Sequence, residues 1–207
     1  MQEEFITLTI VFILALISPG PDFIVTVKES LLQNSKAGSI CALGIGLGLA
    51  IHVLYCICGL ALIVSESILI FNIIKLLGAF YLIYIGIKAL KSKGTEMKEL
   101  LIKRNAKKRS LAASFKTGFL TNILNPKATL FMISLFSLAI KDTTPIYAQA
   151  LYGLWMIFLA VSWFIFVSFC FSNAYVKGFF FKFNKYIDKT LGTILILLGL
   201  KLAFMRR

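Results

Sequence analysis

The stretch that decides the fold is "ALISPGPDFIVTV", residues 15–27, which places two prolines, a glycine and an aspartate inside the first long apolar run. Proline lacks an amide hydrogen and its ring clashes with the preceding turn, so a helix kinks or breaks there. Without those residues the run would suit a membrane helix, since about 20 apolar residues cross a bilayer core. The break and the ionisable group beside it therefore need an explanation from the rest of the chain.

The composition is that of a membrane protein. Of the 207 residues, 59% are apolar and 15% are charged, whereas roughly a quarter of the residues in a soluble domain are charged. The segments that approach the length of a membrane span are 5–27, 40–64, 68–90, 113–140, 146–172 and 187–204. The sequence predicts an all-α integral membrane protein, with about six transmembrane helices forming a single transmembrane domain in the lipid bilayer.

The charge distribution predicts the orientation. The net charge is +13, and ten of the 22 basic residues lie between Lys88 and Lys116. A basic block between membrane spans is typical of a cytoplasmic loop. We therefore expect loop 91–112 to be cytoplasmic and both termini to lie outside. No nucleic-acid-binding motif accompanies the block, so we do not expect nucleic acid as a partner.

The basic loop divides the chain into two halves, 1–90 and 113–207. The first and fourth apolar segments both contain prolines beside polar groups, "SPGPD" at 18–22 and "NILNPK" at 122–127. With three spans per half, the halves insert in opposite orientations. Inverted repeats with broken helices are a recurring transporter design, with the substrate site near the membrane midplane. The pattern predicts two inverted three-helix repeats, although a structural kink remains the alternative for either break taken alone.

Charged and amide side chains at the breaks are candidate substrate ligands. Intramembrane carboxylates are costly and mark pathways, so Asp22 is predicted to bind a substrate ammonium group or to carry a coupled proton; capping is the alternative. Lys127 is predicted to hold a substrate carboxylate or to pair with Asp22; a lysine that reaches the interface is the alternative. Asn122 and Asn125 contact substrate or cross-link helices. Unwound backbone beside Gly20 presents further amides.

His52, the only histidine, lies inside the second apolar segment. It is a candidate proton relay, and a hydrogen bond to a neighbouring helix is the alternative. No Cys or acidic cluster accompanies it, so we expect no metal site and no cofactor. The predicted substrate or proton pathway consists of Pro19, Gly20, Pro21, Asp22, His52, Asn122, Asn125, Pro126 and Lys127.

Glycines inside the apolar segments predict close helix packing. Gly44 and Gly48 are four residues apart and so share one helix face, which allows two backbones to approach. Gly78, Gly86, Gly192 and Gly199 are expected to act similarly. Such faces also make a homodimer conceivable, although they serve packing within one subunit equally well.

Several segments together resemble a known family. "ISPGPD" (17–22), "GIGLGLAIH" (44–52), "LGAFYLIYIGIKAL" (77–90) and "SFKTGFLTNILNPKATLF" (114–131) are similar, in this order, to motifs of the lysine exporter/RhtB-type translocator family. The resemblance covers nearly the whole chain. It implies a bacterial inner-membrane exporter of amino acids or their derivatives, driven by the proton gradient. A small zwitterionic substrate and a coupling proton are then the expected partners.

Two alternatives remain within the same superfamily. A cation exporter would share the fold. A membrane thiol-disulfide electron carrier would need paired cysteines at the two breaks, where this chain has Ser18, Pro19, Asn125 and Lys127. A membrane hydrolase would need a nucleophile with its base or a metal, and the residues supply no such set. We therefore do not expect an enzyme.

Overall fold

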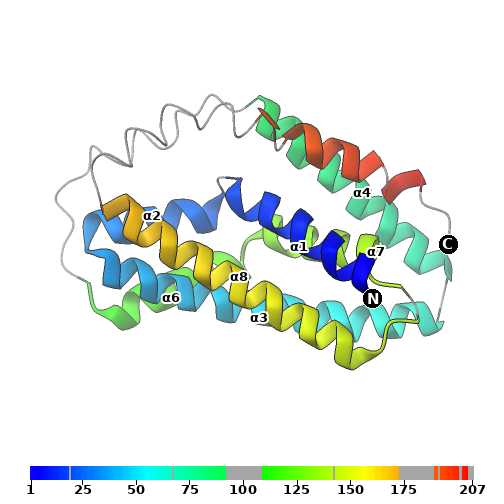
Figure 1. The fold of residues 1–207 in the computed structure, drawn as a ribbon, viewed down its shortest axis with the longest axis horizontal. Helices are drawn as coiled ribbons and strands as arrows, with labels where there is room; N and C mark the ends of the chain where they lie inside the picture. The colour runs from blue at the N-terminus through cyan, green and yellow to red at the C-terminus, as the bar shows by residue number, and fades with distance from the viewer. Residues whose placement is uncertain are drawn as a thin grey trace.

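The computed structural model is a bundle of α-helices (Figure 1). It describes residues 1–18, 20–66, 68–91, 109–141, 143–172, 189–190, 192–200 and 202–204, and no strand occurs among them. The helices are α1 (Gln2–Ile17), α2 (Pro21–Leu32), α3 (Ser35–Glu66), α4 (Ile68–Leu90), α6 (Leu111–Ile123), α7 (Pro126–Ala139) and α8 (Ile146–Ser172). Further helical residues lie within Gly192–Phe204. Pro19 and most of loop 91–112 lie outside the described residues.

The described helices include two to four candidate membrane spans. α3 and α8 are each long and apolar enough to cross a membrane. Two helix pairs qualify as bent spans, α1 with α2 at an angle of 52° and α6 with α7 at 56°. The all-helical prediction and the breaks in the first and fourth apolar segments are confirmed. The described apolar parts of the third and sixth segments, Leu76–Leu90 and Gly192–Phe204, are shorter helices, so six spans in inverted repeats stay a prediction.

In each bent pair, a short proline-containing segment ends the first helix and begins the second. Pro21 and Pro126 stand in the first turn of α2 and α7, where the missing amide costs little because the first amides of a helix have no partner within it. The side chain of Asn125 caps α7 by accepting a hydrogen bond of 2.9 Å from the amide of Lys127. Both bends thus follow from local sequence.

Glycines on α3 and α6 bring these two helices into direct backbone contact. A Cβ added to Gly44 would overlap the carbonyl oxygen of Phe115, and one added to Gly118 would overlap that of Cys41. α3 packs on α6 and α8 more extensively than any other helices pack on each other. The predicted small-residue face on α3 is confirmed, and its partner is α6.

A second glycine contact joins α4 to the C-terminal helical segment, which lie side by side in Figure 1. A Cβ added to Gly86 or to Gly192 would lie 2.6 Å from the carbonyl oxygen of the other residue, and Gly199 also faces the α4 backbone. Gly78 of α4 faces α7, and its carbonyl oxygen accepts a 3.0 Å hydrogen bond from the hydroxyl of Ser134 on α7. These glycines pack as the sequence predicts.

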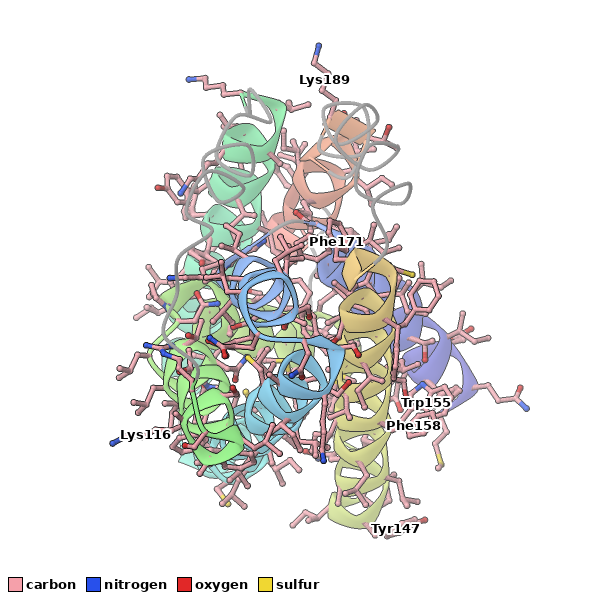
Figure 2. All side chains as sticks on the ribbon, turned by 90° about the vertical axis from the view of Figure 1, so that its left-hand side faces the viewer. Lys116, Tyr147, Trp155, Phe158, Phe171 and Lys189 are labelled. Atoms are coloured by element: carbon pink, nitrogen blue, oxygen red, sulfur yellow. The ribbon has the colours of Figure 1, made fainter. Side chains whose placement is uncertain are left out.

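The outward faces of α3 and α8 are apolar. Their exposed side chains include Leu43, Leu47, Ile51 and Leu54 on α3, and Leu151, Leu154, Phe158 and Phe166 on α8. Figure 2 shows α8 from the end that carries Tyr147 to the end that carries Phe171. Water-soluble monomers rarely expose apolar patches of this kind, so these faces fit contact with lipid.

The contact of α3 with α6 can be tested with two glycines of the same helix. We expect Gly44→Ala to destabilise the protein by about 1–3 kcal/mol, because the new methyl group must push the α6 backbone away. Gly59→Ala is the control: a Cβ there would have no atom of a described residue within 4 Å, and alanine favours a helix. Thermal unfolding of both variants in detergent measures the difference, and equal midpoints would contradict the close contact.

Candidate functional site

A cavity of about 70 Å³ lies between the two helix breaks. Since about 10–15 Å³ holds one water molecule, it has room for several. Six of the nine predicted pathway residues line it: Gly20, Pro21, Asp22, Asn122, Asn125 and Lys127. His52 and Pro126 are not part of this lining, and Pro19 lies outside the described residues. The fold thus brings together most of the residues that the sequence singled out, from both halves of the chain.

Asp22, in the first turn of α2, reaches across to the second break. Its Oδ2 atom accepts a 2.9 Å hydrogen bond from Nδ2 of Asn122. Oδ1 is buried and accepts no hydrogen bond from a described residue, although the side chain of Asn125 lies close to the same carboxylate. The buried Oδ1 of this half-buried carboxylate therefore keeps its capacity to accept a hydrogen bond, and a cationic donor can use it.

Lys127, at the start of α7, brings a positive charge to the same cavity. A Cβ added to Gly20 would lie 3.1 Å from Nζ of Lys127, so the glycine leaves space for the ammonium group beside the first break. Lys127 also acts electrostatically on Asp22. The two predicted charges thus meet at one cavity, while a direct ion pair between them stays a prediction.

The orientation of the Asn122 amide depends on a glycine of α3. A Cβ added to Gly48 would lie 2.7 Å from Oδ1 of Asn122, so any larger residue would displace this side chain. With Oδ1 directed at the α3 backbone, Nδ2 is directed at Asp22. The small-residue face of α3 therefore also positions a side chain of the cavity.

His52 lies behind the second break and satisfies its backbone. Nε2 is 3.1 Å from the carbonyl oxygen of Asn122, and Nδ1 is 2.6 Å from the hydroxyl of Tyr55. Because a carbonyl only accepts, Nε2 donates and Nδ1 accepts from Tyr55. Pro126 has no amide to offer the Asn122 carbonyl four residues earlier, so His52 replaces that donor. This is the helix-to-helix hydrogen bond of the alternative hypothesis, and the relay role stays a prediction.

Sequence reasoning missed the buried carboxylate of Glu29 on α2, which is 3% exposed. Its Oε1 accepts a 3.1 Å hydrogen bond from the guanidinium of Arg109, and its Oε2 accepts a 2.8 Å bond from the hydroxyl of Ser114. The end of α2 is thereby joined to the start of α6. The available signal was the spacing from Asp22 to Glu29, because residues seven apart lie on one helix face.

A second missed carboxylate, Glu4, lies in the first turn of α1 and is also 3% exposed. Its Oε1 accepts a 2.7 Å hydrogen bond from the hydroxyl of Thr144, and its Oε2 accepts one of 3.3 Å from Tyr152 on α8. Glu4 and Glu29 stand near opposite ends of the bent α1–α2 pair. A buried carboxylate cluster therefore joins each end of this pair to the second half of the chain.

Comparison with known proteins identifies relatives along the whole chain. The model of the LysE type translocator family matches residues 13–206. An uncharacterized membrane protein of Bacillus subtilis (strain 168) is 32% identical over 89% of this chain and 91% of its own. The threonine efflux protein of Escherichia coli (strain K12) is 28% identical over the full length of both chains.

The leucine efflux protein of Salmonella choleraesuis (strain SC-B67) is 34% identical over 61% of this chain and 58% of its own. The threonine and leucine relatives are both named as efflux proteins and not as enzymes. No solved structure matches the chain. The matches and the apolar helices together indicate a membrane transport protein.

The role of His52 in supporting the break can be tested by stability. We expect His52→Leu to cost about 1–3 kcal/mol, because the Asn122 carbonyl loses a donor and Tyr55 loses its acceptor. Tyr55→Phe removes only the outer hydrogen bond and should cost less, about 1 kcal/mol. Thermal unfolding in detergent ranks the variants, and a His52→Leu protein as stable as the parent would disprove this role.

The Glu29 cluster makes a second stability prediction. Arg109→Ala leaves the buried carboxylate of Glu29 with Ser114 as its hydrogen-bond partner among the described residues. We expect the protein to lose about 1–2 kcal/mol of stability. This is less than the roughly 3–5 kcal/mol lost when a fully buried pair is broken, because Arg109 is 52% exposed.

Adding Glu29→Gln to that variant should recover part of the loss, because the unpaired charge is then gone. Lys116→Ala, an exposed position of α6 labelled in Figure 2, is the control. Unfolding midpoints that fall equally for Arg109→Ala and Lys116→Ala would argue against the buried pair.

Proposed function

The chain belongs to the LysE type translocator family, and we propose that it exports amino acids or amino-acid derivatives across the bacterial inner membrane. The observation that carries the proposal is the cavity between the helix breaks, which is lined by both Asp22 and Lys127. A carboxylate and an ammonium group in one cavity complement the two charges of a zwitterion. The names of the threonine and leucine efflux relatives support the same substrate class.

In this proposal the substrate ammonium binds Asp22 and the substrate carboxylate binds Lys127. The ammonium supplies the donor that Oδ1 of Asp22 can accept, and hydrogen bonds between charged groups are the strong ones. The carboxylate then lies near the starts of α2 and α7, whose first turns bring Pro21 and Lys127 to the cavity. The positive ends of these helix dipoles favour an anion.

Transport then needs the cavity to open to each side in turn. The bent pairs, at 52° and 56°, support two inverted halves around one site, as in other transporters with broken helices. With loop 91–112 cytoplasmic and both termini outside, the Glu29 cluster lies towards the cytoplasm and the Glu4 cluster towards the outside. We propose that one cluster separates while the other stays closed.

Proton coupling belongs to the same proposal. Asp22 is the acidic residue of the cavity lining, and a carboxylate that exchanges a proton for a substrate ammonium group couples the two fluxes. A homodimer is proposed without a surface assigned to it, because Gly44 and Gly48 of α3 and Gly78 and Gly86 of α4 pack within one chain. No specific observation favours a cation exporter or a thiol-disulfide electron carrier.

Export can be tested in cells that accumulate amino acids. Cells that lack the gene and are loaded with dipeptides should retain one or a few amino acids that parent cells release. If every amino acid is retained equally in both strains, the export proposal loses its main support.

Complementation of the deleted strain tests the site. Asp22→Asn should reduce export about 10- to 100-fold, since a hydrogen bond to a charged group contributes roughly 1.5–3 kcal/mol. Glu3→Gln, at an exposed acidic residue of α1, should leave it unchanged. A charge-swapped Asp22→Lys, Lys127→Asp double variant that exports no better than either single variant would argue against a direct pair.

A further inference from the structure

Away from the two breaks, the wall of the cavity is apolar. Phe12 comes from α1, Leu49 from α3, Phe131 from α7 and Phe164 from α8. Each of these side chains is less than a tenth exposed, so all four face the interior of the protein. Because four helices contribute to this wall, its shape is set by the packed core and not by a loop.

The charges of the cavity are all at the breaks. Among the residues that the structure describes, Asp22 and Lys127 are the only charged side chains in the lining. The other buried carboxylates, Glu4 and Glu29, are held in their own clusters. His52 donates to a backbone carbonyl behind the break. A charge on a substrate side chain would therefore meet no opposite charge in the apolar wall.

We propose that this cavity selects amino acids with uncharged, branched aliphatic side chains, and that Phe12, Leu49, Phe131 and Phe164 form the subsite that sets this preference. The inference rests on the proposed export function. The α-ammonium and α-carboxylate of the substrate use both charges of the lining. Burying a further, unpaired charge is strongly unfavourable, so lysine, arginine, aspartate and glutamate are excluded.

The size of the cavity and the apolar chemistry of its wall also determine which uncharged side chains the proposed subsite prefers. The cavity of about 70 Å³ also has to hold the ammonium and carboxylate groups, so a compact aliphatic side chain fits it better than an indole ring. An apolar pocket discriminates only about 100-fold against an isostere that adds a hydroxyl group. We therefore expect valine to be preferred over threonine by about 10- to 100-fold, and lysine and glutamate to be rejected more strongly.

The direct test is counterflow with the purified full-length protein in phospholipid vesicles. The radiolabelled amino acids are valine, leucine, threonine, lysine and glutamate, each measured against its own unlabelled internal pool. Valine and leucine should exchange at least about tenfold faster than lysine and glutamate, the factor that corresponds to 1.4 kcal/mol. Protein-free vesicles give the background rate.

The outcomes separate this inference from the proposed function. Lysine or glutamate exchanging as fast as leucine would overturn the aliphatic subsite and leave amino-acid export intact. If none of the five exchanges above background, the aliphatic subsite is overturned, and the retention test in cells decides whether export of another amino acid or derivative stands. Threonine exchanging faster than valine would show that the wall recognises a hydroxyl group, which also overturns the inference.

A matched pair of variants tests the wall itself. Leu49→Asp places a carboxylate in the apolar wall and should raise the ratio of lysine to leucine exchange about tenfold or more. Leu49→Asn has the same shape without the charge and should not raise it. An equal rise in both variants would contradict the proposed charge exclusion. The counterflow panel on the unaltered protein decides the question even if Leu49→Asp does not fold.

Discussion

The fold depends on one constraint: a helix broken inside a bilayer must satisfy its backbone without water. At the second break, Pro126 deprives the Asn122 carbonyl of its usual donor. Nε2 of His52 replaces that donor at 3.1 Å, and the amide of Asn125 adds a bond of 3.0 Å. The break is thus tied to α3, so the kink has a fixed geometry and can position a site.

That hydrogen bond requires α3 and α6 to lie close together, which is what their glycines permit. Gly44 and Gly118 remove the side chains that would separate the two backbones, and Gly48 leaves room for the Asn122 amide. The amide then donates to Asp22 on the other bent pair. One chain of contacts therefore leads from the glycines through the proline break to the carboxylate in the cavity.

Much of this arrangement was predictable from residue types, because prolines, glycines and intramembrane charges have few alternative explanations in a membrane helix. The breaks, the α3 glycine face and the candidates Asp22 and Lys127 were recognised in this way. Glu4 and Glu29 were not, because their partners Thr144 and Ser114 lie far away in the chain and carry no distinctive pattern. A hydrogen bond from His52 to a neighbouring helix was foreseen, but its acceptor was not, since a backbone carbonyl is a partner that no residue type reveals.

The division of the cavity into charged breaks and an apolar wall separates two tasks. In the proposed function the breaks bind the ammonium and carboxylate groups that all amino acids share, and the backbone requirements of the two bends fix the geometry of the breaks. The proposed subsite for the side chain, the part by which amino acids differ, consists of packed residues such as Leu49 and Phe164 that lie outside the two breaks. The proposed substrate preference can therefore change through the wall, while the proposed transport mechanism depends on the breaks.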